Sequence, residues 1–298
     1  MNYRKLEERI CIMISWAAAA VALLALTIIL GTITWEALPS LSIYFMVTPE
    51  SDVPGLGGGV ANAIAGTFLL AVLSTAFAAP LALGTAIYLK RYTKSGAFVN
   101  AMNFLLDVLA GTPSIVLGVF GLFFLVFYMK HITGGFSLFA ATIALVLVVL
   151  PVIERATETA IDSVPAEIEE GSYALGATKW ETLRHITIPY ASVGMITGVI
   201  LGIGRAVEQS AVVLLTAGYT QFLPEFKILP SEVLIFGIEI RPLQDLVAAL
   251  PITVFRSFSQ PHLTPASDGF GAAFALVLIM ILLNATIRIL IRWRGQVG

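Results

Sequence analysis

Charged residues are scarce in this sequence of 298 residues. They make up 12% of it, whereas hydrophobic residues make up 58% and the mean hydropathy is +0.91. A soluble domain carries roughly 25% charged residues, about twice as many. The apolar surface therefore needs a solvent other than water, which predicts an integral membrane protein with lipid as a partner. The formal net charge of −2 argues against a nucleic-acid partner.

Groups that hold metals or phosphate cofactors are also few. The single cysteine, Cys11, excludes an intramolecular disulfide and argues against a thiolate metal cluster. The three histidines share no ligand spacing. No Gly-Lys dipeptide occurs, so a P-loop of the usual form is absent. We expect no cofactor, no metal and no enzymatic activity in this chain.

Long hydrophobic runs, in contrast, are abundant. Crossing a hydrocarbon core of roughly 30 Å takes about 20 helical residues. Six runs are long enough, which predicts an all-α polytopic fold with six transmembrane helices. The third run contains Gly111-Thr112-Pro113-Ser114, where we expect a kink or a break. The predicted spans are 10–33, 63–89, 98–128, 136–153, 191–217 and 269–291.

Basic residues are distributed unevenly between the connections. One side of the predicted membrane, the side of both termini, has Arg4, Lys5, Arg9, Lys90, Arg91, Lys94, Arg155, Lys179, Arg184, Arg288, Arg292 and Arg294. The other side has only Lys130, Lys227, Arg241 and Arg256. The positive-inside rule then predicts a multi-pass protein of the cytoplasmic (inner) membrane with both termini in the cytoplasm. In the long outer connection, 218–268, we expect a short interfacial or re-entrant helix that starts at Pro242.

A polar segment, 165–189, separates the fourth and fifth spans on the predicted cytoplasmic side. Pro165 suits a first helical turn, and Gly176 suits a left-handed helix cap. Thr178 and Glu181 have the spacing of a capping box, in which each side chain bonds the other residue's amide. We expect two short helices, the second of which ends near Pro189. An ordinary, well-capped loop is the alternative interpretation.

The spacing of seven residues in this segment favours a specialised loop. Their pattern resembles the EAA loop of ABC importer permeases, in which a glutamate and two small residues precede a glycine and an I-x-L-P-like end. The residues are Glu170, Gly171, Ser172, Gly176, Ile186, Ile188 and Pro189. The resemblance implies a coupling helix that docks into a cleft on the ATP-hydrolysing subunit, with Glu170, Gly171, Ser172 and Gly176 at the contact.

Three further stretches resemble phosphate-specific permeases, the PstA/PstC pair, and together with LPITVFRSFSQP (250–261) before the last span they make the chain look more like PstA. The three stretches are GGGVANAIAGTFLLAVLSTAFAAPLALGTAIYLKRY (57–92), LAGTPSIVLGVFGL (109–122) and GVILGIGRAVEQSAVVLLTAG (198–218). The resemblance implies a type I importer permease, divided into a first span with its outer connection (1–62), a permease domain (63–291) and a cytoplasmic tail (292–298). The implied partners are a PstC-like permease subunit, a homodimeric PstB-like ATP-binding subunit and an extracytoplasmic PstS-like phosphate-binding protein.

Two charged residues interrupt the fifth span. At about 100° per residue, Arg205 and Glu208 share an arc of roughly 120° with Gly194, Gly198 and Gly202. Because glycines let a neighbouring helix come close, we expect this face to point into the protein. An ionisable group at that depth is expensive and is a candidate for the substrate pathway, where Arg205 offers a planar fork to phosphate oxygens. A self-neutralising ion pair is the alternative.

Other site residues and other functions stay open. Thr112 and Ser114 at the predicted break are candidates for the pathway, although a packing kink explains them equally well. Glu208 either moderates the charge of Arg205 or accepts the P–OH hydrogen of phosphate. The sequence departs from the family pattern here: Glu208-Gln209-Ser210 stands where the resemblance leads us to expect a Gly-Glu-Thr-like run. The alternative functions are an ABC permease for another oxyanion or small solute, and a secondary transporter without an ATPase, which would show paired repeats that are not visible here.

Overall fold

The computed structural model describes residues 3–52, 58–93, 96–230, 234, 238–262 and 264–295. Helices dominate this part of the chain. They are α1 (Tyr3–Ala37), α2 (Ile43–Val47), α3 (Ala61–Ile87), α4 (Ala97–Gly111), α5 (Ser114–Gly121), α6 (Lys130–Thr133), α7 (Leu138–Asp162), α8 (Ala166–Ala174), α9 (Lys179–Thr182), α10 (Ile188–Val207), α11 (Ala211–Thr216), α12 (Leu250–Ser259) and α13 (Ala266–Gly295). Strands β1 (Lys227–Pro230) and β2 (Ile238–Arg241) pair antiparallel, with Lys227 opposite Arg241.

The membrane part agrees with the predicted number of spans. Among the described residues, five helices are long and apolar enough to cross a membrane, and the bent pair α4–α5 gives a sixth if it counts as one span. The bend measures 98° and falls where Gly111 ends α4 and Ser114 begins α5, so the predicted break is confirmed. Pro113 lacks an amide hydrogen and disfavours helix at the residue before it, which ends α4 there.

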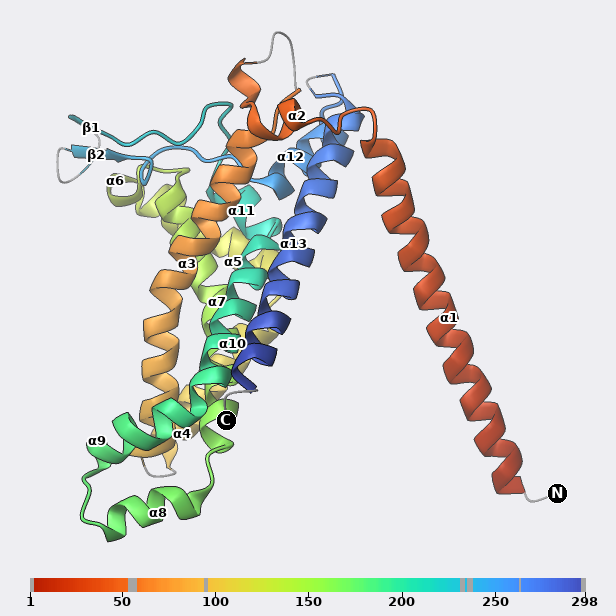
Figure 1. Ribbon diagram of the computed structural model, residues 1–298. Helices are drawn as coiled ribbons and strands as arrows, with labels where there is room; N and C mark the ends of the chain where they lie inside the picture. The colour runs from red at the N-terminus through yellow and green to blue at the C-terminus, as the bar shows by residue number, and fades with distance from the viewer. Residues whose placement is uncertain are drawn as a thin grey trace.

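The ends of the helices define two faces of the molecule (Figure 1). The first turns of α1, the end of α13 and the polar helices α8 and α9 lie at one end, at the bottom of the view. The helices α2, α6 and α12 and the β1–β2 hairpin lie at the other. The basic residues predicted for the outer side, Lys130, Lys227, Arg241 and Arg256, belong to α6, β1, β2 and α12 at this second end. The charge asymmetry of the sequence therefore corresponds to two opposite ends of the structure.

Helices α3, α7 and α10 form the centre of the bundle. Ala71, Ala78 and Ala82 of α3 pack with Val149 and Ile153 of α7 in one buried cluster. Small side chains let the helix backbones approach closely, so that dispersion contacts and not a hydrophobic driving force hold helices together in lipid. Helix α1 is different: none of its most apolar stretch is buried, and Figure 1 shows it meeting the rest of the chain only at its outer end.

The fourth and fifth predicted spans need correction. Helix α7 extends past the predicted end at residue 153 to Asp162, because charged residues of its last turns are paired with other helices. The helix that begins at Lys179 runs on through a π-helical turn, Leu183–Thr187, into α10, so the second short helix does not end near Pro189. A π turn changes the hydrogen-bond spacing, and here it directly precedes the proline and accommodates its missing amide.

The same span also ends earlier than predicted. Helix α10 stops at Val207, and α11 is a separate helix that begins at Ala211, whereas the sequence predicts one helix through residue 217. In the outer connection, the predicted helix does not start at Pro242, which lies in the turn after β2. Helix α12 starts at Leu250 and has Pro251, not Pro242, in its first turn, so the predicted start was wrong. The β1–β2 hairpin was not predicted.

Candidate functional site

The predicted coupling segment is a two-helix knob at the end of the molecule that carries both termini (Figure 1). Its capping box is present: the amide of Glu181 donates to Thr178 Oγ1, and the amide of Thr178 donates to Glu181 Oε2 at 2.8 Å. Gly176 has a φ of +88°, the left-handed conformation that glycine adopts without strain. The local structure of this segment was therefore correctly predicted up to α9.

One surface of the knob is open. A Cβ built on Gly171 meets no atom within 4 Å, and Glu170 is also exposed. Ser172 is half-buried because its hydroxyl lies 2.9 Å from that of Thr182, which joins α8 to α9. Large apolar side chains stand out beside them, above all Leu175, whose exposed fraction is 91%. Exposed apolar side chains next to small residues are typical of a docking surface for another protein.

The knob is tied to two membrane helices by one carboxylate. Glu169 of α8 accepts a hydrogen bond from Arg91 Nε at 3.0 Å and one from the hydroxyl of Thr187 at 2.5 Å. Arg91 lies in the π-helical turn Tyr88–Tyr92 at the end of α3 and also donates to the carbonyl of Ile161 at 3.0 Å. Thr187 lies directly before α10. Short, charge-assisted bonds thus connect α8 to the end of α3 and to the residue before α10, and Arg91 also contacts α7.

The glycine-lined face of α10 packs as predicted. A Cβ on Gly198 would lie 2.7 Å from Ala156 Cβ, and one on Gly202 would lie 2.7 Å from Ile153 Cγ1. Gly194 is equally close to Ala160. All three neighbours belong to α7. The three glycines therefore set the distance between α10 and α7.

The two charges on the same arc are not packed into this chain. The side chains of Arg205 and Glu208 are 44% and 51% exposed, and their charged atoms are 4.0 Å apart, so the prediction that they point into the protein is wrong for the single chain. Arg205 lies one turn beyond Gly202, and its long side chain extends out of the α10–α7 contact. Because Gly202 packs on Val149, near the middle of α7, Arg205 lies close to the level of the middle of that helix.

Two helix breaks lie at about the level of Arg205 and Glu208: one between α4 and α5 and one between α10 and α11. A Cβ on Gly118 of α5 would meet Ala211 and Val212, and one on Gly121 would meet Thr216. Helices α5 and α11 therefore run parallel, which puts Ser114, the first residue of α5, level with the break after Val207. Half-helices with free amides at mid-membrane are typical of anion pathways in transporters. Thr112 donates its hydroxyl to Val108 O at 2.6 Å, so it is satisfied within α4.

The structure adds a groove that the sequence did not indicate. It has a volume of about 560 Å³ and runs along α13 beside Glu208. Its other polar residues are Asn284 and Arg288, and apolar residues of α13 form the rest. No motif singles out Asn284 and Arg288 in the sequence, since only the packing of α13 beside the end of α10 shows that they share a groove with Glu208.

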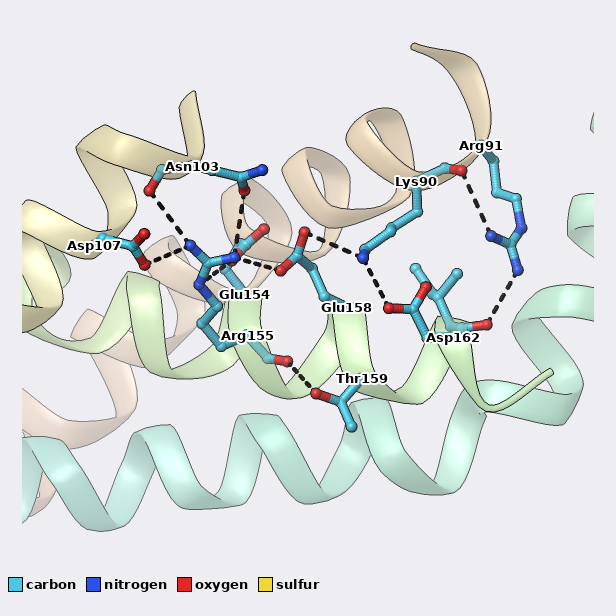
Figure 2. Close-up of polar contacts among 10 residues, drawn as sticks. Lys90, Arg91, Asn103, Asp107, Glu154, Arg155, Glu158, Thr159 and Asp162 are labelled. Carbon is cyan, nitrogen blue, oxygen red and sulfur yellow. Dashed lines mark hydrogen bonds and ion pairs between the residues drawn. The ribbon is translucent and has the colours of Figure 1, made fainter. Parts of the chain in front are cut away.

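A charged network joins α3, α4 and α7 near the coupling end (Figure 2). Arg155 donates to Asp107 of α4 at 2.7 Å and to Glu158 of its own helix at 2.6 Å. Lys90 is 2.7 Å from Asp162 and 3.8 Å from Glu158. Sequence analysis placed Arg155 in a loop and gave no role to the acidic residues, because it ended the fourth span too early.

A second buried charged cluster lies at the outer end. Glu50 accepts a hydrogen bond from the hydroxyl of Tyr219, and its Oε2 is 3.9 Å from Arg256 Nη1. The guanidinium of Arg256 stacks over the Tyr219 ring, 3.6 Å from its centroid. Burial, and then the bond to Glu50, raise the pKa of Tyr219 above its ordinary value. The cluster joins α12 to the segments before α3 and after α11. Among the described residues, no group of three potential ligands that could hold a metal ion occurs.

The comparisons with solved structures define the class of fold. The chain matches a subunit of a bacterial alginate ABC transporter, solved with an alginate-bound periplasmic protein, over 96% of each chain with a TM-score of 0.63 and 14% identity. It matches the inward-facing MetNI methionine ABC transporter over 78% of this chain and 94% of that chain, with a TM-score of 0.58 and 18% identity. The fold is that of type I ABC importer permeases, with up to six membrane-crossing helices.

Sequence relatives define the family. Residues 78–295 match the family described as binding-protein-dependent transport system inner membrane component, and the chain belongs to this family. It is 36% identical over 240 residues to the phosphate transport system permease protein PstA of Mycobacterium leprae. The aligned region covers 80% of this chain and 71% of that protein. The chain is 30% identical to PstA of Yersinia pestis, over 97% of this chain and 91% of that protein.

Proposed function

We propose that this chain is the membrane-spanning permease subunit of an ATP-driven importer that moves inorganic phosphate across the cytoplasmic membrane. The observation that carries the proposal is the position of Arg205: its side chain is 44% exposed, and it lies level with the middle of α7 and with two helix breaks. The two relatives of the chain described above, PstA of Mycobacterium leprae and PstA of Yersinia pestis, are named for phosphate transport. Fold alone would leave the solute open, because neighbours of the same fold serve alginate and methionine transporters.

In the proposed assembly, several surfaces of the chain meet partners. The knob docks on a PstB-like ATPase, which supplies the ATP chemistry that this chain lacks. The half-exposed charged face of α10 meets a PstC-like permease subunit, so that the pathway forms between the two. A PstS-like protein delivers phosphate to the outer end. Lipid and the second permease subunit cover the apolar surface of α1.

The orientation follows from charge and from the knob. Lys94 lies outside the described residues; the other basic residues of the predicted inner side belong to elements near the end of the molecule that carries the knob, and we place this end in the cytoplasm together with both termini. ATP-driven closure of the ATPases then moves α8. Glu169 transmits this movement to α3 through Arg91 and to α10 through Thr187. The breaks after Gly111 and Val207 allow the outer halves of the broken helices to respond separately.

The anion is recognised by complementary chemistry at mid-membrane. Arg205 presents a planar pair of donors to two phosphate oxygens. The amides at the start of α5 add a favourable field, since a helix N-terminus carries a partial positive charge. Glu208 accepts the hydrogen of a protonated phosphate oxygen, which sulfate lacks at neutral pH. This second contact distinguishes phosphate from other tetrahedral oxyanions.

Uptake by the purified complex in proteoliposomes tests this function. With ATP on the knob side and the binding protein on the other, labelled phosphate should accumulate, and excess sulfate or molybdate should not compete. Accumulation of sulfate or molybdate in place of phosphate would support the permease of another oxyanion. Accumulation driven by an ion gradient without ATP would support a secondary transporter and would refute the proposal.

A further inference from the structure

Among the described residues, Glu154 of α7 combines complete burial with a lack of hydrogen bonds to its carboxylate. Its side chain is fully buried, and neither carboxylate oxygen has a hydrogen-bond partner. Its neighbours include Ile153, which packs with alanines of α3 and the glycine face of α10. A carboxylate buried in such surroundings without hydrogen bonds is strongly destabilised unless it is neutralised.

The nearest cation does not neutralise it. Arg155 Nε is 3.8 Å from Glu154 Oε2, too far for a hydrogen bond. The two terminal nitrogens of the same guanidinium are already committed, one to Glu158 and the other to Asp107 (Figure 2). Arg155 also donates two hydrogen bonds of 3.3 Å to Asn103 of α4, one to the side-chain oxygen of Asn103 and one to its backbone carbonyl. The guanidinium is therefore held towards α4 and away from Glu154.

The charges around Glu154 are unbalanced. Two cations lie in electrostatic range of it: Arg155 of α7, at 3.8 Å, and Lys90 at the end of α3, which is paired with Glu158. Three other carboxylates already hold these cations, namely Asp107 of α4 and Glu158 and Asp162 of α7. From α10, the glycines Gly198 and Gly202 and the apolar residues Val199 and Ile203 pack against this part of α7, and none of the four carries a charge. An ionised Glu154 would be a fourth carboxylate beside two cations, with no hydrogen bond to stabilise it.

We propose that Glu154 is a proton-binding site that determines the partner of Arg155. While Arg155 is bound to Asp107 of α4, Glu154 is a neutral carboxylic acid. When α4 moves away from α7, the guanidinium turns to Glu154, which is already within 3.8 Å, and Glu154 releases its proton. The proton passes to the aqueous phase at the coupling end, where Asp162 is exposed. The site thus exchanges a proton when the α4–α7 contact opens and closes.

The sign of the pH dependence follows. Protons favour the state in which Arg155 is bound to α4, because that state has the neutral Glu154. Raising the pH favours the state in which Arg155 pairs with Glu154 and α4 is released. A purely structural acid, buried and paired in both states, would give no such dependence.

Infrared spectroscopy of the assembled complex with its ATPase tests the proposal. A protonated carboxyl without hydrogen bonds gives a separate C=O stretching band, which should be present at neutral pH in the wild type. Glu154→Gln should abolish the band, and Glu36→Gln, at an exposed position in α1, should leave it unchanged. A wild type without the band, or a Glu154→Gln complex that keeps it, would overturn the proton-binding site.

A second variant tests the exchange of partners. Asp107→Asn removes the carboxylate that holds Arg155 on α4, at an exposed position where the change is tolerated sterically. The band of Glu154 should then be lost at neutral pH, because the free guanidinium pairs with it. Persistence of the band in Asp107→Asn would overturn the exchange. Assembly with the ATPase shows that each variant is folded, and the readout does not depend on phosphate uptake, so it can fail independently of the proposed function.

Discussion

Arg91 and Glu169 connect the end of a membrane helix to the polar knob: Arg91 Nε donates to Glu169 Oε1 at 3.0 Å, and both side chains are largely buried. The residues are 78 positions apart in the sequence. Glu169 precedes the glutamate of the EAA-like pattern, Glu170, which is exposed. The two adjacent acids thus have different positions: Glu169 faces the membrane helices, and Glu170 lies on the exposed surface of the knob.

Loss of this contact should uncouple ATP hydrolysis from transport. Glu169→Ala removes the acceptor shared by Arg91 and Thr187, so α8 can move without α3 or α10. We expect phosphate uptake per ATP hydrolysed to fall severalfold in proteoliposomes. As the control, Arg91→Ala combined with Glu169→Ala should cost less than the sum of the two single changes, because both remove the Arg91–Glu169 contact. Additive losses in the double variant would show that the two residues act separately.

The open surface at Gly171 should accept a small side chain and reject a large one. Gly171→Ala should be neutral, since a Cβ there meets no atom within 4 Å. Gly171→Trp should leave membrane insertion intact but prevent α8 from docking, which is measured by co-purification with the ATPase and by its transport-coupled activity. Normal assembly and transport by Gly171→Trp would contradict the docking role.

Gly176 is constrained by its backbone and not by space. Its φ of +88° lies in the left-handed region, although nothing surrounds its Cβ position. Gly176→Ala should therefore destabilise the knob by about 1–2 kcal/mol. Hydrogen exchange of the α8 amides in the complex measures this, and Gly171→Ala serves as the matched helical control. Equal protection in the two variants would argue that the cap is unimportant.

Cysteine labelling in a Cys11→Ser background tests the orientation. Thr178 and Glu225 are both exposed and lie at opposite ends of the molecule, one in the knob and one before β1. In intact cells, an impermeant maleimide should label Glu225→Cys and should reach Thr178→Cys only after the membrane is opened. Labelling of Thr178→Cys in intact cells would reverse the proposed topology.

The outer charged cluster should contribute to stability. Glu50→Ala would leave Arg256 without its carboxylate and Tyr219 without its acceptor, in a largely buried place. Breaking a buried pair in this way costs about 3–5 kcal/mol. The melting temperature of the complex in detergent should fall clearly, whereas Glu225→Ala, at an exposed site, should change it little. An unchanged melting temperature in Glu50→Ala would show that the cluster is not stabilising.

The sequence predicted those elements that local rules determine. Six apolar runs, the break at Gly111–Ser114 and the Thr178–Glu181 capping box depend on length, on proline and on neighbours three residues apart. The errors arose where distant contacts decide. Helix α7 extends through Glu154 and Arg155 only because Lys90 and Asp107 pair with the charges of its last turns.

The candidate site shows the same limit. The glycine face of α10 was correctly predicted, because small residues at helical spacing indicate close packing wherever the neighbour comes from. The exposure of Arg205 and the groove beside Asn284 were not predicted, because both depend on how far α7 and α13 extend along α10. The buried Glu154 was missed because its burial depends on packing against distant segments.

The central claim is that phosphate passes Arg205 on a route driven by ATP hydrolysis in another subunit. Uptake by the assembled Arg205→Lys complex tests it most directly, because lysine keeps the charge and loses the two-donor fork. Losing one charge-assisted hydrogen bond of about 1.5–3 kcal/mol should lower phosphate uptake roughly ten- to a hundredfold while assembly is preserved. Phosphate uptake at the wild-type rate would contradict the claim and would leave Arg205 and Glu208 as a structural ion pair.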